Sequence, residues 1–433
     1  MTFYKTFSSK IIFLRFSFLR ILFCFAFIFV FTLLGCSGSK STKDNVANNQ
    51  NDILKLPTQW VGTWGTAPQL VEPNNMPPEP GLTNNTLRQI VRVSIGGDSI
   101  RLRFNNEFSK SPVTMKAVQI AVSKDSSVID VATIKELTFN GKTEVTMQPN
   151  GVLTSDPMAF KLSPRMDIAI TIYFGETSPD VTGHPGSRTT SYIYEGNKIS
   201  EEHFNSAVKT EHWYIINGID VKATEEANAL VILGNSITDG RGSGTDKQNR
   251  WPDMLSERFL KNPATRQIGV LNMGIGGNCV LRGGLGPTAL NRFDRDVMKQ
   301  HGVKWLIILE GVNDLGGTRS SEAANMVADG LIAAYGKMID EAHSQNIIVY
   351  GATILPIDKS FYYQDYRETA RQKVNDWIRN SGKFDAVIDF DKAMSDPENP
   401  SVILPNAHTG DFLHPNELGY VLMAESIDLK LFE

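Results

Sequence analysis

Cysteine is scarce in this chain, which contains three among its 433 residues. Cys24 lies in an apolar N-terminal run and Cys36 directly follows that run, so only Cys279 belongs to the folded body. A single thiol cannot pair within the chain, and core packing rather than a disulfide framework must therefore stabilise the fold. A free cysteine is more often a small buried apolar residue than a nucleophile, and Cys279 is expected to be one.

The sequence also lacks the charge and histidine patterns of several functional classes. Its net charge is −4, with no basic stripe and no acidic tail, so nothing indicates a nucleic-acid partner. The seven histidines are scattered, and neither His-Glu-x-x-His nor Cys-x-x-Cys occurs. We therefore expect no metal and no cofactor.

The N-terminus reads as an export signal. An unbroken apolar run of residues 21–34 is the right length for the core of a signal peptide and short for a membrane span. The basic residues that precede it are Lys5, Lys10, Arg15 and Arg20. An uncleaved anchor that starts near Ile11 is the alternative interpretation.

The apolar run ends in Leu33-Leu34-Gly35-Cys36, which resembles a bacterial lipobox. Leu34 is an unusual residue in front of the Gly-Cys pair. The resemblance implies that residues 1–36 are a lipoprotein signal and that Cys36 carries the lipid. Residues 37–56 are polar and predict a flexible tether. We expect an exported lipoprotein of the bacterial cell envelope, in the periplasm or outer membrane, held to the membrane by its lipid.

Residues 57–224 have the pattern of an all-β domain. Residues 87–95 and 100–104 alternate apolar and polar side chains, and the Gly-rich link 96–99 between them predicts a hairpin. Further strands are expected at 116–122, 133–139, 143–147, 167–173 and 212–216. Short strands at this spacing predict a sandwich of jelly-roll type that serves as an accessory module without chemistry of its own.

Three tryptophans, Trp60, Trp64 and Trp213, lie near the ends of this β region. They can plug the core or form a platform on which sugars stack, and core packing is the favoured interpretation.

Residues 225–433 change to alternating strands and helices. Strands are expected at 230–233, 267–271, 305–309, 347–353 and 386–390. Helices are expected at 251–260, 322–343 and 364–380, and a last helix opens at 415–418, where Pro415 suits a first turn. Parallel strands joined by helical crossovers predict a three-layer α/β/α domain.

Polar or glycine clusters follow most of these strands. The first strand runs into Gly234-Asn235-Ser236, the second into residues 272–278 with three glycines, and the third into residues 310–314. Asp411 and His414 follow the last strand. Ligands bind beyond the carboxyl ends of parallel strands, so a hydroxyl, backbone donors, an amide and an Asp/His pair converge there. Acyl transfer needs these parts: a nucleophile, a base, a group that orients the base and an oxyanion hole.

From about Ala229 to the C-terminus, these four blocks resemble the SGNH hydrolases, or GDSL esterase/lipase family, whose domain is flavodoxin-like. The resemblance implies roles position by position. Ser236 is the nucleophile, His414 the general base and Asp411 the residue that orients it. The oxyanion donors are the backbone N–H groups of Ser236 and Gly277 and the side-chain amide of Asn313.

One residue departs from the family pattern, because Asn235 stands where the family usually has Asp. That Asp is not the acid of the triad, so catalysis is not directly threatened. The loss of a charge beside the nucleophile is expected to alter the rigidity of the turn or the response to pH.

Several other polar residues near the four blocks are interpreted as structural. Asp314 is expected to cap a turn, and Arg250 to anchor the helix that follows it or to line the cleft. A buried unpaired carboxylate is costly, so Glu310 is expected to pair with Arg250 or Arg292. His408 is expected to be a loop residue.

The predicted function is a membrane-tethered serine esterase that removes short acyl groups, acetyl above all, from a polysaccharide or another small ester. The loops 240–250 and 282–287 are polar and glycine-rich, with no apolar run to line an acyl channel. One alternative is a lipase or lysophospholipase, which needs a long apolar groove. The other is a glycan-binding lipoprotein with a degenerate site.

Overall fold

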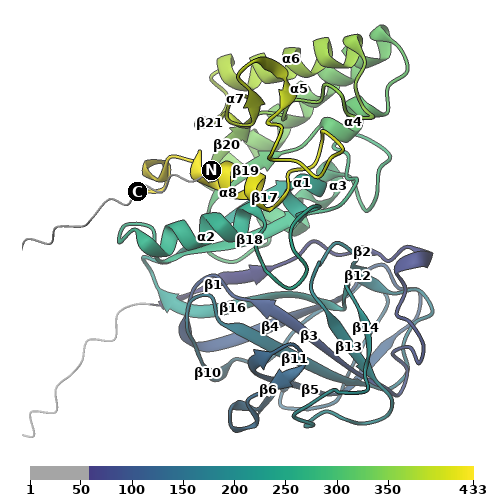
Figure 1. Cartoon of the computed structure of the whole chain (residues 1–433). Coiled ribbons are helices and arrows are strands. Elements are labelled where there is room, and N and C mark those ends of the chain that lie inside the picture. Colours follow the sequence, from purple (N-terminus) through teal and green to yellow (C-terminus); the bar gives the residue numbers. More distant parts are fainter. Residues whose placement is uncertain (1–57) are drawn as a thin grey trace, which may run out of the picture. The chain divides into compact units, whose positions relative to one another are not determined.

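A computed structural model describes residues 58–433 (Figure 1). The predicted signal, the lipobox at Cys36 and the tether lie outside the described residues. The described residues belong to one compact unit. No helix in residues 58–433 combines the length and the apolar content that a membrane crossing requires.

The N-terminal part is built of antiparallel strands, as predicted. The first sheet has the order β1 (Thr58–Gly65), β16 (Ile216–Thr224), β4 (Gly97–Asn106) and β10 (Met158–Leu162), with β9 (Gly151–Thr154) also paired to β4. The second has the order β14 (Val208–Thr210), β13 (Ser191–Tyr194), β3 (Thr86–Arg92), β11 (Asp167–Phe174), β5 (Val113–Asp125) and β6 (Val128–Ile129), with β7 (Lys135–Glu136) and β8 (Val145–Met147) also on β5. A small third sheet contains β15 (Trp213–Tyr214), β12 (Thr182–His184) and β2 (Gln69–Leu70). The jelly-roll form stays a prediction.

The predicted hairpin of residues 87–104 is wrong, because β3 and β4 lie in different sheets. Directly after β3, the Val93 N–H donates to the carbonyl of Met166, beside the second sheet. The next N–H, of Ser94, donates to the carbonyl of Thr63 in the first sheet. The link therefore crosses between sheets. Alternation shows that one face of each strand is buried, but it does not identify the neighbouring strand.

The C-terminal part contains the predicted parallel sheet, in the order β18 (Ile268–Gly274), β17 (Asn228–Gly234), β19 (Val303–Leu309), β20 (Ile348–Ala352) and β21 (Ala386–Ile388). The helices are α1 (Ser236–Asp239), α2 (Trp251–Lys261), α3 (Ala289–Phe293), α4 (Val312–Gly316), α5 (Ser321–His343), α6 (Asp365–Asn380), α7 (Phe390–Ala393) and α8 (Glu417–Glu425). A small hairpin of β22 (Ser395–Asp396) and β23 (Asn399–Ile403) follows α7. Each strand and helix predicted here is present, with ends shifted by a few residues.

Both faces of the parallel sheet are covered, which explains the continuous apolar run of β17. Leu230 and Ile232 pack in one apolar cluster with residues of α2 and α8. Val231 and Leu233 point the other way, into a second cluster that includes residues of α5. A strand buried on both faces has no polar side to show in its sequence. The flavodoxin-like assignment of this part stays a prediction.

The strand-rich part and the parallel-sheet part share one hydrophobic core. The same cluster contains Val61 of β1 and Leu271 of β18. Hydrogen bonds also connect the two parts. The Gly62 N–H donates to the carbonyl of His301 at 3.0 Å, and the Val270 N–H donates to the Ser94 hydroxyl at 2.9 Å. The division at residues 224 and 225 stays a prediction, but the two parts are packed as a single body.

Two of the three tryptophans are core residues, as predicted. Trp64 and Trp213 are buried and make an edge-to-face contact, with ring centroids 5.0 Å apart. Trp60 is half-buried, and the guanidinium of Arg101 lies 4.5 Å from its ring centroid. None of the three forms an exposed aromatic platform.

Candidate active site

Ser236 is the first residue of α1, a single helical turn at the carboxyl end of the central strand β17. The Asn235 side-chain oxygen caps this turn by accepting from the Ile237 N–H at 3.1 Å. Gly240 ends it in a left-handed conformation, with φ of 102°. The serine is thus presented at a sharp junction between strand and helix, as the sequence predicts.

The structure brings Ser236, His414 and Asp411 together. Ser236 Oγ lies 2.9 Å from His414 Nε2, and His414 Nδ1 lies 2.6 Å from Asp411 Oδ2. The other carboxylate oxygen of Asp411 accepts the N–H groups of Leu413 and His414 at 3.0 and 2.9 Å. A carboxylate requires a proton on Nδ1, which leaves the Nε2 lone pair facing the serine hydroxyl.

The ionisation states of His414 and Asp411 follow from burial and hydrogen bonding. His414 is 3% exposed, and burial lowers its pKa despite the attraction of Asp411. Burial favours the neutral form of Asp411, but the hydrogen bonds from His414 and Leu413 outweigh it and hold the pKa of Asp411 well below its ordinary value. At neutral pH the imidazole is therefore neutral and the carboxylate ionised, as a general base and its orienting acid require.

Gly277 and Asn313 line a common groove. Gly277 has a φ of 67°, a left-handed conformation that favours glycine. The Asn313 Nδ2 donates to the carbonyl of Asn278 at 2.7 Å, and the Tyr362 hydroxyl donates to Asn313 Oδ1 at 2.9 Å. These partners determine which way the amide faces and leave a second Nδ2 hydrogen for a ligand. The sequence carried no signal for Tyr362, which lies in a loop before α6.

Arg292 of α3 is buried behind this site and connects its parts. Its guanidinium donates to the carbonyls of Gly234 and Met273, which end β17 and β18, at 2.9 and 2.6 Å. It also donates to Asn278 Oδ1 at 3.0 Å and pairs with Glu310 at 3.3 Å. Of the two partners considered for Glu310, the structure thus selects Arg292.

Arg250 has a different place, at the start of α2. Its Nε donates to the carbonyl of Asp239 at 3.1 Å, and its Nη1 pairs with Asp253 at 3.1 Å. Arg250 therefore connects the end of the turn α1 to the first turn of α2, in agreement with the expected anchoring role.

The departure at position 235 has a structural reason. Asn235 Nδ2 donates to Glu310 Oε2 at 3.3 Å, and Glu310 is fully buried. Burial, outweighing the attraction of Arg292, raises the pKa of Glu310 to about 8. An Asp at 235 would place a second carboxylate against Glu310, whereas the amide supplies a donor.

This contact predicts how stability responds to Asn235→Asp. The raised pKa of Glu310 means that its contribution to stability is complete below about pH 4.5 and is lost as the pH rises through about 8. A second carboxylate should raise that pKa further, so we expect Asn235→Asp to cost about 2–4 kcal/mol of unfolding free energy at pH 8 and clearly less at pH 5. Urea unfolding at both pH values measures the difference.

The double variant Asn235→Asp/Glu310→Gln is the matched control. A glutamine at 310 can donate to an aspartate at 235, so most of the loss at pH 8 should be recovered. An equal loss at both pH values, or no recovery, would contradict the pairing of Asn235 with Glu310.

Three further residues are placed by the structure. Asp314 accepts the N–H groups of Val280 and Leu281 at 2.9 and 3.0 Å, so it holds the segment after Gly277 rather than capping its own turn. Cys279 is buried, as expected, and burial raises its pKa to about 12. A thiol with that pKa is un-ionised and a poor nucleophile at neutral pH. His408 accepts the Gly410 N–H within its own loop.

Comparisons with known proteins place part of the chain in one family of sequences. Residues 232–422 match the model of the GDSL-like lipase/acylhydrolase family. No curated protein sequence matches the chain.

Among solved structures, similar chains include a lipase/acylhydrolase from Enterococcus faecalis, with 21% identity, a TM-score of 0.37 and coverage of 47% of this chain and 95% of its own. A catalytic mutant of an acetylxylan esterase from Geobacillus stearothermophilus has 21% identity and a TM-score of 0.36, covering 47% and 94%. A lipolytic protein of the G-D-S-L family from Veillonella parvula DSM 2008 has 21% identity and a TM-score of 0.34, covering 46% and 96%. Because the identities and TM-scores are low, the substrate named for each of these proteins is a property of that protein only.

The family match begins within β17 and ends within α8, so it contains Ser236, Gly277, Asn313, Asp411 and His414. Residues 232–422 thus match the GDSL-like lipase/acylhydrolase family, and the protein is a carboxylic-ester hydrolase.

Proposed function

We propose that this enzyme hydrolyses short-chain acyl esters, acetyl above all, through a Ser236–His414–Asp411 triad. The observation that carries the proposal is the hydrogen-bonded chain from the serine hydroxyl through the imidazole to the carboxylate, at 2.9 and 2.6 Å. This unbroken series of hydrogen bonds argues against a glycan-binding protein with a degenerate site.

In the proposed reaction, His414 Nε2 takes the proton of Ser236 as Oγ attacks the acyl carbon. The negative charge on the carbonyl oxygen is stabilised by the N–H groups of Ser236 and Gly277 and by the free Nδ2 hydrogen of Asn313. His414 returns the proton to the leaving alcohol. Water, deprotonated by the same imidazole, then attacks the acyl carbon, and His414 returns this proton to Ser236 Oγ as the acid leaves.

The groove beside Gly277 and Asn313 is more apolar than its loops alone indicated. Loop 282–287 contributes Arg282 and two glycines to it, as expected, but Met326 and Val327 of α5 also line it. Met326 is 67% exposed. Loops 240–250 and 282–287 contain no apolar run, and the apolar side chains of this groove come in part from the neighbouring helix α5 instead.

This groove contains charged as well as apolar side chains. Two arginines, Arg282 and Arg319, line the groove beside Leu281 and Met326. Arg319 lies just before α5. A long acyl chain gains affinity only where consecutive methylenes lose contact with water. The arginines favour an acyl group short enough to stay near Asn313. Met326 and Val327 are the observation that favours the second candidate, an acylhydrolase for longer chains.

A series of p-nitrophenyl esters separates the two candidates. A buried methylene contributes about 0.8 kcal/mol, nearly fourfold in affinity, so a true acyl channel gains steeply with chain length. We expect kcat/KM to be highest for acetyl or propionyl esters and to fall by octanoyl. The series is measured at fixed pH, with each ester below its micelle threshold, beside acetylated glycans.

Met326→Ser is the matched variant for this series, because it removes the most exposed apolar side chain of the groove. The acetyl rate should be unchanged by it. An efficiency that rises through decanoyl in the natural enzyme, and that Met326→Ser abolishes, would replace the acetylesterase by the long-chain acylhydrolase.

We also propose that the enzyme acts in the bacterial cell envelope on an acylated carbohydrate. The support is the signal-like run of residues 21–34 followed by the lipobox-like Leu33-Leu34-Gly35-Cys36. A lipid on Cys36 would hold the enzyme at a membrane surface, with residues 37–56 as a spacer.

A further inference from the structure

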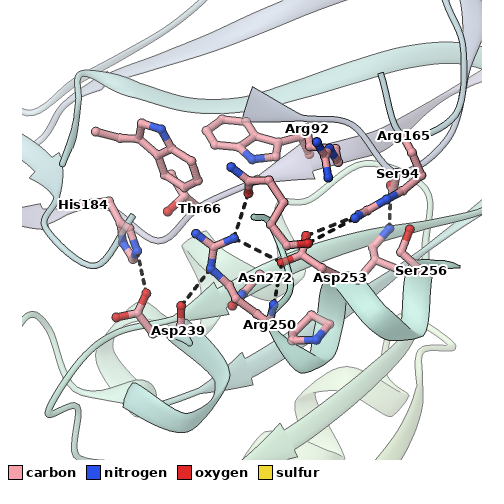
Figure 2. A pocket seen from close by; sticks show the side chains of 16 residues that line it. Thr66, Arg92, Ser94, Arg165, His184, Asp239, Arg250, Asp253, Ser256 and Asn272 are labelled. Atoms are coloured by element: carbon pink, nitrogen blue, oxygen red, sulfur yellow. Dashed lines mark hydrogen bonds and ion pairs between the residues drawn. The ribbon is translucent and has the colours of Figure 1, made fainter. Parts of the chain in front are cut away.

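A second buried His–Asp pair lies at the far end of the turn that carries Ser236. Asp239, the last residue of α1, has its Oδ1 2.8 Å from His184 Nε2. His184 is 4% exposed and Asp239 is 2% exposed. Figure 2 shows them facing each other across the contact between β12 and α1. His184 belongs to the strand-rich part, whereas Asp239 belongs to the part that matches the hydrolase family.

The partners of His184 determine its protons. Its Nδ1 lies 2.9 Å from the carbonyl of Ala67, which can only accept, so Nδ1 carries a proton. Its Nε2 faces the carboxylate of Asp239. Burial disfavours the ionised form of Asp239, but the attraction of His184 and Arg188 outweighs it and lowers the pKa of Asp239. An ionised Asp239 can only accept, so its contact with His184 Nε2 is a buried hydrogen bond to a carboxylate, to which Arg188 adds an ionic attraction.

The segment around His184 encloses the Asp239 side chain. Arg188 Nη1 lies 3.6 Å from Asp239 Oδ2. Gly186 has no space for a side chain, because a Cβ there would overlap the Asp239 carboxylate. Residues 184–188 of the strand-rich part therefore hold this carboxylate from several directions. Trp213 stacks beside the His184 ring, with centroids 6.0 Å apart.

A single helical turn is too short to be stable through its own hydrogen bonds, so its position depends on contacts with its neighbours. Ile237 packs in the apolar core, and Asn272 Nδ2 donates to the Thr238 carbonyl at 2.8 Å. The Asn235 cap holds the first end. At the second end, the backbone carbonyl of Asp239 is bound by Arg250 and its side chain by His184 (Figure 2). Asp239 lies three residues after Ser236 in the same turn, so a displacement of Asp239 is expected to move Ser236.

Stability alone is a weak reason for this pair. A buried ion pair recovers little more than the cost of removing two charges from water, and apolar residues of similar size commonly replace such pairs without loss. The alternative use of a buried charged pair is to impose one geometry on the groups that it joins. Here those groups are β12 and the turn of the nucleophile.

We propose that His184 is a positioning residue: through Asp239 it holds α1 so that Ser236 stays aligned with His414 and the oxyanion donors. The strand-rich part is then a component of the active site and not only an accessory module. This inference rests on the proposed role of Ser236. Misplacement of a reacting group by about 1 Å can cost on the order of 10²-fold in rate.

The test compares His184→Ala and His184→Gln with the natural enzyme. Turnover of p-nitrophenyl acetate and titration of Ser236 with a p-nitrophenyl phosphonate are measured on the full-length folded protein. We expect His184→Ala to lower kcat and the phosphonylation rate by the same factor, about 10- to 100-fold, with KM changed less than threefold. The amplitude of the titration should stay near one site per chain. His184→Gln, which can still donate to Asp239, should recover a large part of the rate.

His212→Ala is the matched control, because His212 is a half-buried neighbour whose ring bonds the carbonyl of Pro185 and packs edge-on against Tyr214. It should leave the rates within twofold. A structural role alone would lower the titration amplitude and leave the rate of each active site unchanged.

A His184→Ala enzyme with natural rates at full amplitude would overturn the inference while leaving the esterase intact. If His184→Ala does not fold, His184→Gln and Asp239→Asn decide: natural phosphonylation rates in both would overturn the inference. Failure of the proposed function is distinguishable, since phosphonate would then not label Ser236 in the natural enzyme.

Discussion

Replacing Ser236 with alanine is expected to lower kcat by on the order of 10⁴-fold or more while the protein stays folded. In the proposed mechanism the serine hydroxyl attacks, since it is 2.9 Å from His414 Nε2, whereas the nearby Cys279 thiol is buried with its pKa raised to about 12. Removal of a triad nucleophile leaves only the catalysis that the oxyanion hole and substrate binding supply. Steady-state hydrolysis of p-nitrophenyl acetate measures the loss.

Ser243→Ala is the control for this substitution, because it removes a serine hydroxyl from the loop that follows α1. In the part of the chain that the structure describes, the Ser243 hydroxyl has no hydrogen-bond partner. Its variant should keep the natural turnover, and both variants should unfold within a few degrees of the natural protein. A Ser236→Ala enzyme that retains a tenth of the natural turnover would mean that another group attacks.

The second large effect is expected from Asn313→Ala, which should lower kcat by about 10²–10³-fold with little change in KM. The Asn313 amide has one hydrogen on the carbonyl of Asn278 and the other free, so it can donate to an oxygen on which negative charge builds. Such a donor matters more in the transition state than in the ground state, which places its effect on kcat. Initial rates over a range of ester concentrations separate the two constants.

Tyr362→Phe tests the same amide by removing the hydroxyl that orients it. The hydroxyl of Tyr362 holds Asn313 Oδ1 at 2.9 Å, so its removal should lower kcat in the same direction but by less than Asn313→Ala. Tyr363→Phe is the control, because that hydroxyl bonds Asp365 at the surface. An unchanged kcat in Asn313→Ala would remove the amide from the oxyanion hole.

The sequence by itself determined the order of elements and the chemistry at the strand ends. A parallel strand buried on both faces needs a continuous apolar run, and β17 and β19 each contain one. The carboxyl ends of parallel strands must meet at one edge, so Ser236, Gly277 and Asn313 could be placed together before any distance was known. Asp411 and His414 could be joined because they lie three residues apart.

Only the tertiary structure decided which distant residues became partners. The alternating pattern in β3 and β4 indicates one buried face on each strand, but the two strands lie in different sheets. Glu310 had two arginines within reach by sequence, and the position of α3 selected Arg292. Local patterns record the period of an element and its buried face, whereas pairing depends on how separate elements pack.

The contacts that hold the nucleophile show the same limit. Tyr362 and His184 lie in segments without any motif, on either side of Ser236 in the chain, and each reaches the site through one side chain. A single hydrogen bond between residues far apart leaves no periodic trace in the sequence. The sequence therefore predicts what the candidate active site is made of, and the packing of the strand-rich part against the parallel sheet decides what surrounds it.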